Sequence, residues 1–131
     1  MLIIDGVEYA DKIIVSGMRE RFEKVYGDAP TMKMNGEYSY DVIGTRFIHT
    51  AVLSKNPTVP QSETNALFAL LADTKESHVV TLPHDEGEIT YAAHFSGGER
   101  ALLDIINGKY IWDDNITVEF QPIAPQIRSE E

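Results

Sequence analysis

Two adjacent carboxylates, Asp113 and Asp114, follow the only tryptophan in the stretch YIWDDNITVEFQPIAP. Paired carboxylates can bind a divalent cation or carry out acid and base chemistry. A calcium loop also needs alternating oxygen ligands, a glycine at the bend and a distal bidentate glutamate, which WDDNITVEF does not supply. Asp and Asn stabilise turns through side-chain hydrogen bonds to their own backbone. We therefore predict a turn at residues 113–115 rather than a metal or acid-base site.

The four histidines would form a metal site if three of them converged. They are His49, His78, His84 and His94. His78 and His94 belong to the two arms of one predicted hairpin. Pairing around residues 84–87 places His78 opposite Ala93 and leaves His94 on the other face of the sheet. No HxxxH or HxH spacing occurs, so we predict no metal site.

Other sequence patterns that carry catalysis or bind phosphate are missing. The segments FSGGER and IVSGMR lack the GxSxG pattern of a nucleophile elbow, and there is no P-loop or GxGxxG pattern. A single Gly97–Gly98 pair predicts a hairpin corner rather than an anion-binding nest. The carboxylates of HDEGE, Asp85, Glu86 and Glu88, are predicted to be solvated at a hairpin tip. We predict no catalytic residue and no cofactor, so the protein is not expected to be an enzyme.

Composition indicates one globular domain. A chain of 131 residues is the size of an ordinary domain, and its hydrophobic content of 43% is enough for a core. No segment approaches the roughly 18 apolar residues that a membrane helix needs. The chain contains no cysteine, which excludes disulfides and thiolate ligands. With no signal-peptide pattern at the N-terminus, we expect residence in a cytoplasm.

The charge balance argues against nucleic-acid binding. Eleven basic residues against 21 acidic ones give a formal net charge of -10. The basic residues are scattered, and the densest run, MRERFEK, itself contains two glutamates. Phosphate recognition requires clustered Lys and Arg, so direct binding of DNA or RNA is not expected. The acidic surface is explained by solubility alone, or by contact with a basic protein partner.

The spacing of apolar residues predicts mainly antiparallel strands. Asp5-Gly6 between apolar residues predicts an opening hairpin. Residues 12–26 fit a helix face or a strand, and the β-branched residues at their start favour the strand. The segment YSYDVIGTRFIHTAVL is apolar on both faces and predicts a central strand. A second hairpin turns at residues 84–87, and the last strand directs Ile116, Val118 and Phe120 inward.

One amphipathic helix is predicted in PQSETNALFALLADT, where leucines form an apolar stripe. Residues 99–106 fit either a short helix or a strand, and Asn-Gly at 107–108 predicts a turn. These elements indicate an α+β fold in which a mainly antiparallel sheet of about six strands carries one helix. We expect a single domain over residues 1–124, followed by a polar C-terminal tail at 125–131 that frays.

The segment YGDAPTMKMNGEYSY contains the candidate interface residues, Met32, Met34, Tyr38 and Tyr40. Tyrosine is enriched where proteins bury surface against each other, and Tyr38 and Tyr40 share one side of a predicted strand. Packing in the core explains the same alternation equally well. The loop from Gly27 to Glu37 is predicted to be either a contact arm or a flexible hairpin connection.

Five motifs follow one another along most of the chain: IDGVEY, IGT at the start of a strand, ALFALLA in a helix, VTLP before the second hairpin turn, and an aromatic-led last strand ending near proline. In this order they resemble small proteins encoded among the virion structural genes of bacteriophages and prophages of Gram-positive bacteria. The resemblance implies a structural, tail-associated component with a sheet-plus-helix fold shared with tube and tail-tip proteins. It carries no catalytic signature.

The resemblance also implies partners and location. Such a protein assembles with itself, as a homo-oligomer, and with other virion proteins through sheet edges and loops. It is made in the host cytoplasm and ends in the virion. The alternative function is an acidic binding or regulatory module for a protein partner, which predicts a monomer or dimer. An enzyme would instead need a deep pocket that holds a histidine together with a carboxylate.

Overall fold

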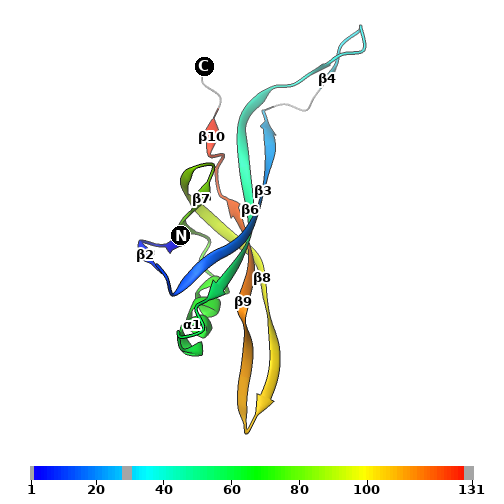
Figure 1. Cartoon of the computed structure of the whole chain (residues 1–131). Coiled ribbons are helices and arrows are strands. Elements are labelled where there is room, and N and C mark those ends of the chain that lie inside the picture. The colour runs from blue at the N-terminus through cyan, green and yellow to red at the C-terminus, as the bar shows by residue number, and fades with distance from the viewer. Residues whose placement is uncertain (1, 28–30, 129–131) are drawn as a thin grey trace.

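The structure is a computed structural model of the chain, and it describes residues 2–27 and 31–128. The described residues form ten strands and one helix, which confirms the predicted α+β class (Figure 1). The elements are β1 (Ile3–Ile4), β2 (Val7–Glu8), β3 (Ile13–Tyr26), β4 (Thr31–Met32), β5 (Tyr38–Ser39), β6 (Val42–Lys55), α1 (Gln61–Leu71), β7 (His78–His84), β8 (Gly87–Ile106), β9 (Lys109–Pro122) and β10 (Ile127–Arg128).

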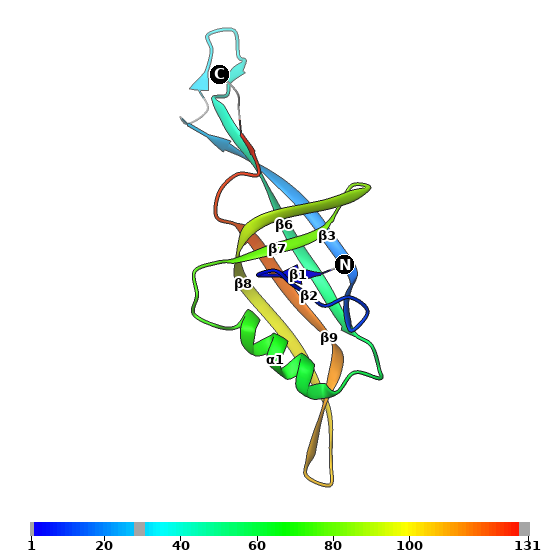
Figure 2. The same ribbon diagram turned by 90° about the vertical axis from the view of Figure 1, so that its left-hand side faces the viewer.

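Four long antiparallel strands in the order β3-β6-β9-β8 form the centre of the fold. The predicted central strand is confirmed, because β6 pairs with β3 on one side and with β9 and β10 on the other. The β7 strand continues the sheet from β8 and pairs with β1, which in turn pairs with β2. In Figure 2, α1, β1 and β7 all lie on the side of β9 that faces the viewer.

The tight turns predicted at Asp5-Gly6 and at residues 107–108 both form. Asp5 and Gly6 both have positive φ, 51° and 82°, as do Asn107 and Gly108, at 52° and 79°. Two consecutive residues with positive φ give the twist that a tight hairpin needs. In the second hairpin His78 lies opposite Ala93, the register that was predicted from the sequence.

The core lies between the long sheet, the β1 and β7 strands, and α1. Ile116, Val118 and Phe120 are buried, as the alternation in the last strand predicts. The helix contributes Leu67 and Leu71 to the same apolar cluster. Phe120 is fully buried and meets Phe95 edge to face, with 5.1 Å between ring centroids.

Two of the predicted turns are wrong. Asp113, Asp114 and Asn115 lie inside the continuous strand β9, at a point where its pairing with β8 is shifted. The Asp113 side chain does accept a hydrogen bond from the backbone N–H of Asn115, at 3.1 Å, but this local bond accompanies an irregularity in the strand, not a turn. The predicted corner at Gly97–Gly98 is likewise an irregularity within β8, where the pairing shifts between Phe95 and Gly97.

The structure shows which secondary structure forms in the two segments for which the sequence allowed either a helix or a strand. Residues 99–106 are strand, because they complete β8, and the favoured strand at residues 12–26 is confirmed as β3. The main sheet has eight strands rather than about six, in part because the two-residue strand β10 was not predicted from the sequence. In the described chain α1 has 11 residues, and no helix there is long and apolar enough to cross a membrane.

The expected fraying of residues 125–131 is wrong for the part that the structure describes. Ile127 and Arg128 form β10 and pair with Thr45 and Gly44 of β6. Their approach is close enough that a Cβ atom at Gly44 would lie 2.8 Å from the carbonyl oxygen of Ile127. Because glycine has no Cβ atom, this position allows β10 to pair with β6. Residues 129–131 lie outside the described chain, and a domain boundary at residue 124 stays a prediction.

Replacing Phe120 by alanine should destabilise the protein by about 3–5 kcal/mol, because it leaves a cavity where the sheet and Phe95 meet. Chemical denaturation followed by circular dichroism measures this change. The control is Ile123→Ala, at a half-exposed side chain, which should cost well under about 1 kcal/mol. Equal losses of stability in the two variants would contradict the placement of Phe120 in the core.

Candidate assembly surfaces

The central sheet has two open edges. Within the described chain, β3 pairs with β6 alone, so its outer backbone edge faces away from the sheet. After Ala93, β8 leaves β7 and pairs only with β9. We call residues 13–26 the β3 edge and residues 97–106 the β8 edge. Unpaired strand edges present backbone N–H and C=O groups that can pair with another chain.

On two other unpaired stretches of strand, a glutamine side chain forms hydrogen bonds to the backbone. The amide of Gln61 accepts a hydrogen bond from Trp112 N–H at 3.2 Å and donates one to the Tyr110 carbonyl at 2.9 Å, where β9 extends beyond β6. The amide of Gln126 does the same with both backbone groups of Phe47, each at 2.9 Å. A side-chain amide here takes the place of a neighbouring strand. The β3 and β8 edges receive no comparable glutamine among the described residues.

The far end of the β8–β9 hairpin is apolar and exposed. This ribbon projects beyond the rest of the fold at the lower end of Figure 1. Six of its large apolar side chains are between 36% and 62% exposed: Leu102, Leu103, Ile105, Ile106, Tyr110 and Ile111. An isolated two-stranded ribbon is marginally stable in water, and a cluster of exposed apolar residues of this kind marks an interaction surface.

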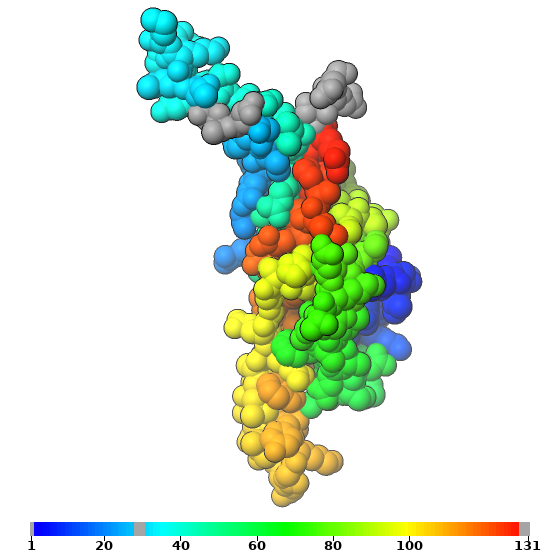
Figure 3. Space-filling model, turned by 180° about the vertical axis from the view of Figure 1, so that it is seen from behind, coloured from blue at the N-terminus to red at the C-terminus, as the bar shows by residue number. Residues whose placement is uncertain are grey.

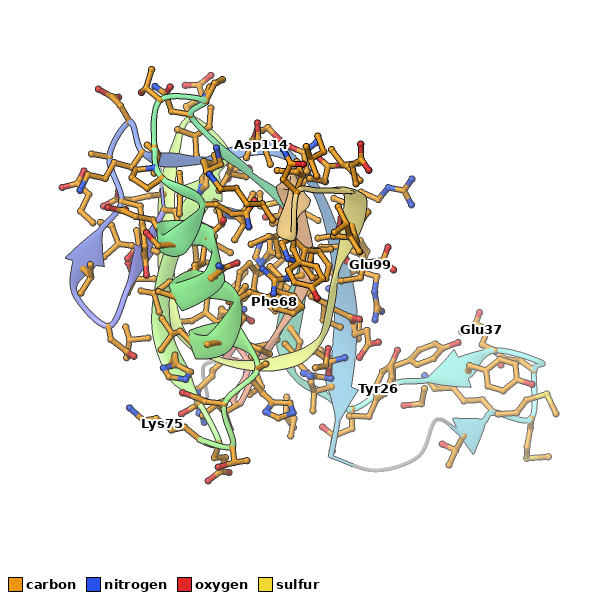
Figure 4. The ribbon with its side chains drawn as sticks, turned by 90° about the horizontal axis from the view of Figure 1, so that it is seen from below. Tyr26, Glu37, Phe68, Lys75, Glu99 and Asp114 are labelled. Carbon is orange, nitrogen blue, oxygen red and sulfur yellow. The ribbon has the colours of Figure 1, made fainter. Side chains whose placement is uncertain are left out.

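A second projection carries the interface residues proposed from the sequence. The short strands β4 and β5 pair with each other and lie apart from the main sheet (Figures 3 and 4). We call residues 31–41 the arm. Met32, Met34, Tyr38 and Tyr40 are all exposed there, and the Tyr38 and Tyr40 rings lie 6.3 Å apart. Residues 28–30 of the predicted loop lie outside the described chain. No described residue buries these four side chains, and their role in an interface stays a prediction.

The arm and the ribbon lie at opposite ends of the molecule (Figure 3). The ring of Tyr40 also packs near Tyr26, at the end of β3, with 5.8 Å between centroids. Aromatic side chains therefore continue from the β3 edge onto the arm. Both projections extend the long strands of the central sheet, so each open edge adjoins exposed apolar surface.

Sequence reasoning missed a cluster formed by two of the histidines. All four histidines lie in the described chain, and no three of them meet, but His49 and His84 share the carboxylate of Glu20. The Glu20 Oε2 atom lies 2.7 Å from His49 Nε2 and 2.6 Å from His84 Nδ1. Glu20 and His49 are cross-strand partners on β3 and β6, so only the pairing of distant strands reveals the contact.

Electrostatics in this cluster favour a charged carboxylate. Burial alone would raise the pKa of Glu20, but hydrogen bonds from His84 and His49 outweigh it and lower that pKa. The hydrogen bond to Glu20 raises the pKa of His84. On its other ring nitrogen, His49 contacts the Tyr91 hydroxyl at 2.7 Å, and burial raises the pKa of this tyrosine. An open groove of about 440 Å³ adjoins His84 and Tyr91.

His78 forms a second cluster that fastens the N-terminal hairpin. Its Nδ1 lies 2.5 Å from Asp5 Oδ2, its Nε2 lies 3.0 Å from Asp73 Oδ1, and its ring stacks on Phe95. Burial alone would lower the pKa of His78, but the hydrogen bonds to Asp5 and Asp73 raise it. His94 lies apart from both clusters and contacts the Glu76 carbonyl. The cluster around His78 is thus a structural ion pair between three segments.

The acidic groups singled out from the sequence do not converge. Asp114 forms an ion pair with Lys55 at 3.0 Å, while Asp113 bonds to its own strand. In the second hairpin, Asp85 approaches His84 Nε2 at 3.4 Å, and its side chain is otherwise exposed. Glu86 and Glu88 are exposed at the same tip. These carboxylates therefore have different contacts and do not share one site.

No family model matches the chain, and no curated protein sequence matches it. Among solved structures, the fold is similar to the crystal structure of SPP1 Dit (gp 19.1), described as a paradigm of the hub adsorption apparatus in phages that infect Gram-positive bacteria, with a TM-score of 0.53 and 12% identity. The similarity covers 95% of this chain and 49% of that one, so this chain spans about half its length. The match confirms, at the level of fold, the resemblance drawn from the sequence.

Replacing His78 by glutamine should flatten the dependence of stability on pH. The folded protein binds the His78 proton more tightly than the unfolded chain does. This stabilisation is therefore complete below the unfolded pKa of about 6.5 and is lost as the pH rises through the folded pKa. At pH 6 the variant should lose about 2 kcal/mol.

The measurement is the free energy of unfolding by urea from pH 5 to pH 9, for wild type and His78→Gln. His94→Gln is the matched control and should follow the wild-type curve. Some slope will remain in every variant, because His84 has a pKa shifted in the same direction. A wild-type slope unchanged in His78→Gln would contradict the ion pair.

Proposed function

We propose that this protein is a structural subunit of a phage tail, and that it assembles with copies of itself by placing the β8 edge of one copy against the β3 edge of the next. The similarity of its fold to the SPP1 Dit hub protein supports the tail assignment. The observation that carries the assembly is the pair of open edges on the two sides of one four-stranded sheet.

Strand direction supports this arrangement. In the order β3-β6-β9-β8, each pair is antiparallel, so β3 and β8 run in opposite directions. An even number of alternating strands means that a β8 edge laid beside the β3 edge of a similarly oriented copy is again antiparallel. The contact joins two different surfaces, which is the kind of contact that generates closed rings when the rotation between subunits closes.

The apolar ribbon gives the contact a source of free energy. Leu103 and Ile105 lie on the β8 edge itself and are 62% and 53% exposed. Burial of such side chains against a neighbour contributes about 25 cal/mol per Å² of apolar surface removed from water. The β3 edge of the next copy offers exposed Phe22 and Ile14 as apolar partners.

Charges on β3 restrict which chains can pair with it. The run Arg19 to Lys24 alternates basic and acidic residues around Phe22. Some of these charges are neutralised within the subunit, since Glu23 bonds to Arg21 at 2.8 Å and to Arg46 at 3.1 Å. Charged side chains on an edge strand discourage indiscriminate pairing. A partner strand with a matching pattern is thereby favoured over an arbitrary one.

The arm would make contacts other than the one between the two edges. Met32, Met34, Tyr38 and Tyr40 project away from the sheet, so they can reach a neighbouring subunit or another virion protein. Methionine adapts to irregular surfaces, and tyrosine offers contact area with little loss of side-chain entropy. The function is assembly and requires no catalytic step. After synthesis in the host cytoplasm, the protein would reside in the virion tail.

Light scattering over a wide concentration range, with negative-stain microscopy of the most concentrated fraction, tests the proposal. We expect a closed oligomer with a central opening. A compact monomer at every concentration would contradict self-assembly and favour an acidic module that binds a protein partner.

Replacing Leu103 by glutamate should weaken self-association at least about tenfold, because it puts a charge where apolar surface is buried between copies. Leu103 is largely exposed in the monomer, so stability of the fold should change by less than about 0.5 kcal/mol. Sedimentation equilibrium gives the association constant. Val79→Glu, at a half-exposed residue of β7, is the matched control. The edge contact is refuted if both variants associate like the wild type.

A further inference from the structure

We infer that Glu20, His49 and His84 form a binding site for one divalent transition-metal ion, with Zn²⁺ as the ion that best fits. Each residue presents one ligand atom, and the three atoms lie within 4.8 Å of one another. They come from three strands, β3, β6 and the end of β7. The inference is independent of oligomer formation.

The chemistry of the three donors selects the class of ion. Two imidazole nitrogens and one carboxylate oxygen are a common ligand set for Zn²⁺, whereas Ca²⁺ and Mg²⁺ take oxygen ligands almost exclusively. In a tetrahedral zinc site with bonds of about 2.0–2.2 Å, neighbouring ligand atoms lie about 3.3–3.6 Å apart. Glu20 Oε2 lies 2.7 Å from His49 Nε2 and 2.6 Å from His84 Nδ1. Side-chain movements of less than about 1 Å would admit an ion in place of the two shared protons.

The second nitrogen of each imidazole already has a suitable partner. His49 Nδ1 lies 2.7 Å from the Tyr91 hydroxyl, and His84 Nε2 lies 3.4 Å from Asp85 Oδ2. Metal-bound histidines almost always donate their remaining N–H to an oxygen, which fixes the tautomer and the orientation of the ring. In the bound form, Nδ1–H of His49 would donate to Tyr91, and Nε2–H of His84 would donate to Asp85.

Burial of the ligands leaves one side of the site accessible. The His49 side chain is fully buried, while those of Glu20 and His84 are 30% and 21% exposed. Water therefore reaches the carboxylate and His84 but not the inner imidazole, and it can supply a fourth ligand. The bound ion would tie the middle of β3 to β6 and to the tip of the β7–β8 hairpin. It would act as a structural crosslink in a chain that has no disulfide.

Isothermal titration of the chelator-treated protein with ZnCl₂ tests this site directly. We expect one saturable site in the wild type, an affinity reduced at least about tenfold in Glu20→Gln and in His84→Ala, and no change in the control His94→Ala. These variants avoid the fully buried His49, and circular dichroism confirms that each is folded. Zinc should also raise the melting temperature of the wild type but not that of Glu20→Gln.

Titration with Co²⁺ provides a readout of the ligand set, because tetrahedral Co²⁺ absorbs visible light far more strongly than the hydrated ion. The wild type should develop this absorption, and Zn²⁺ should displace it. The inference is overturned if no saturable site is found, or if Glu20→Gln and His84→Ala bind Zn²⁺ as tightly as the wild type. Equal weakening in His94→Ala would also overturn it, since the ion would then be bound by scattered surface groups.

Discussion

The fold depends on the pairing of β6 on both of its sides. This strand carries the whole of β3 along one edge and holds β9 and β10 along the other. Ala51 and Leu53 of β6 are buried in the same core as Phe120 of β9. Because β3 is attached to the molecule through β6, its outer edge stays available. The same pairing places Glu20 opposite His49, so both proposed properties derive from one register.

Some unpaired stretches of strand bond to a glutamine side chain, whereas the β3 and β8 edges do not. This difference suits a subunit that assembles through those two edges. The amides of Gln61 and Gln126 occupy backbone groups that would otherwise lack a neighbouring strand. An edge strand that does not pair with another chain is usually protected from such pairing by its own structure. The β3 and β8 edges, together with the apolar ribbon and arm, extend exposed surface to both ends of the molecule. A monomer gains no stability from this surface, whereas an oligomer does.

Local sequence patterns were sufficient for most elements of the fold. Asp5-Gly6 and Asn107-Gly108 encode tight turns through their own backbone preferences, and alternation in Ile116, Val118 and Phe120 encodes a half-buried strand. The turn predicted at Asp113 was wrong because β9 pairs with β8 on both sides of it, at Trp112 and at Ile116, so the strand continues past the local side-chain bond. The cluster of Glu20, His49 and His84 has no local signal, since its members are brought together by tertiary pairing. The open edges could not be assigned either, because strand order is a property of the whole sheet.

Crosslinking between single cysteines tests the edge contact most directly, because the natural chain has none. One cysteine replaces Phe22 on β3, and another replaces Glu99, Leu103 or Ile105 on β8 in separate variants. With a short bismaleimide, we expect crosslinks when a β3 variant is mixed with a β8 variant, and none when either is treated alone. Crosslinks within a single variant would indicate a symmetric dimer instead. Their absence from every mixture, at concentrations where oligomers form, would contradict the β8-to-β3 contact.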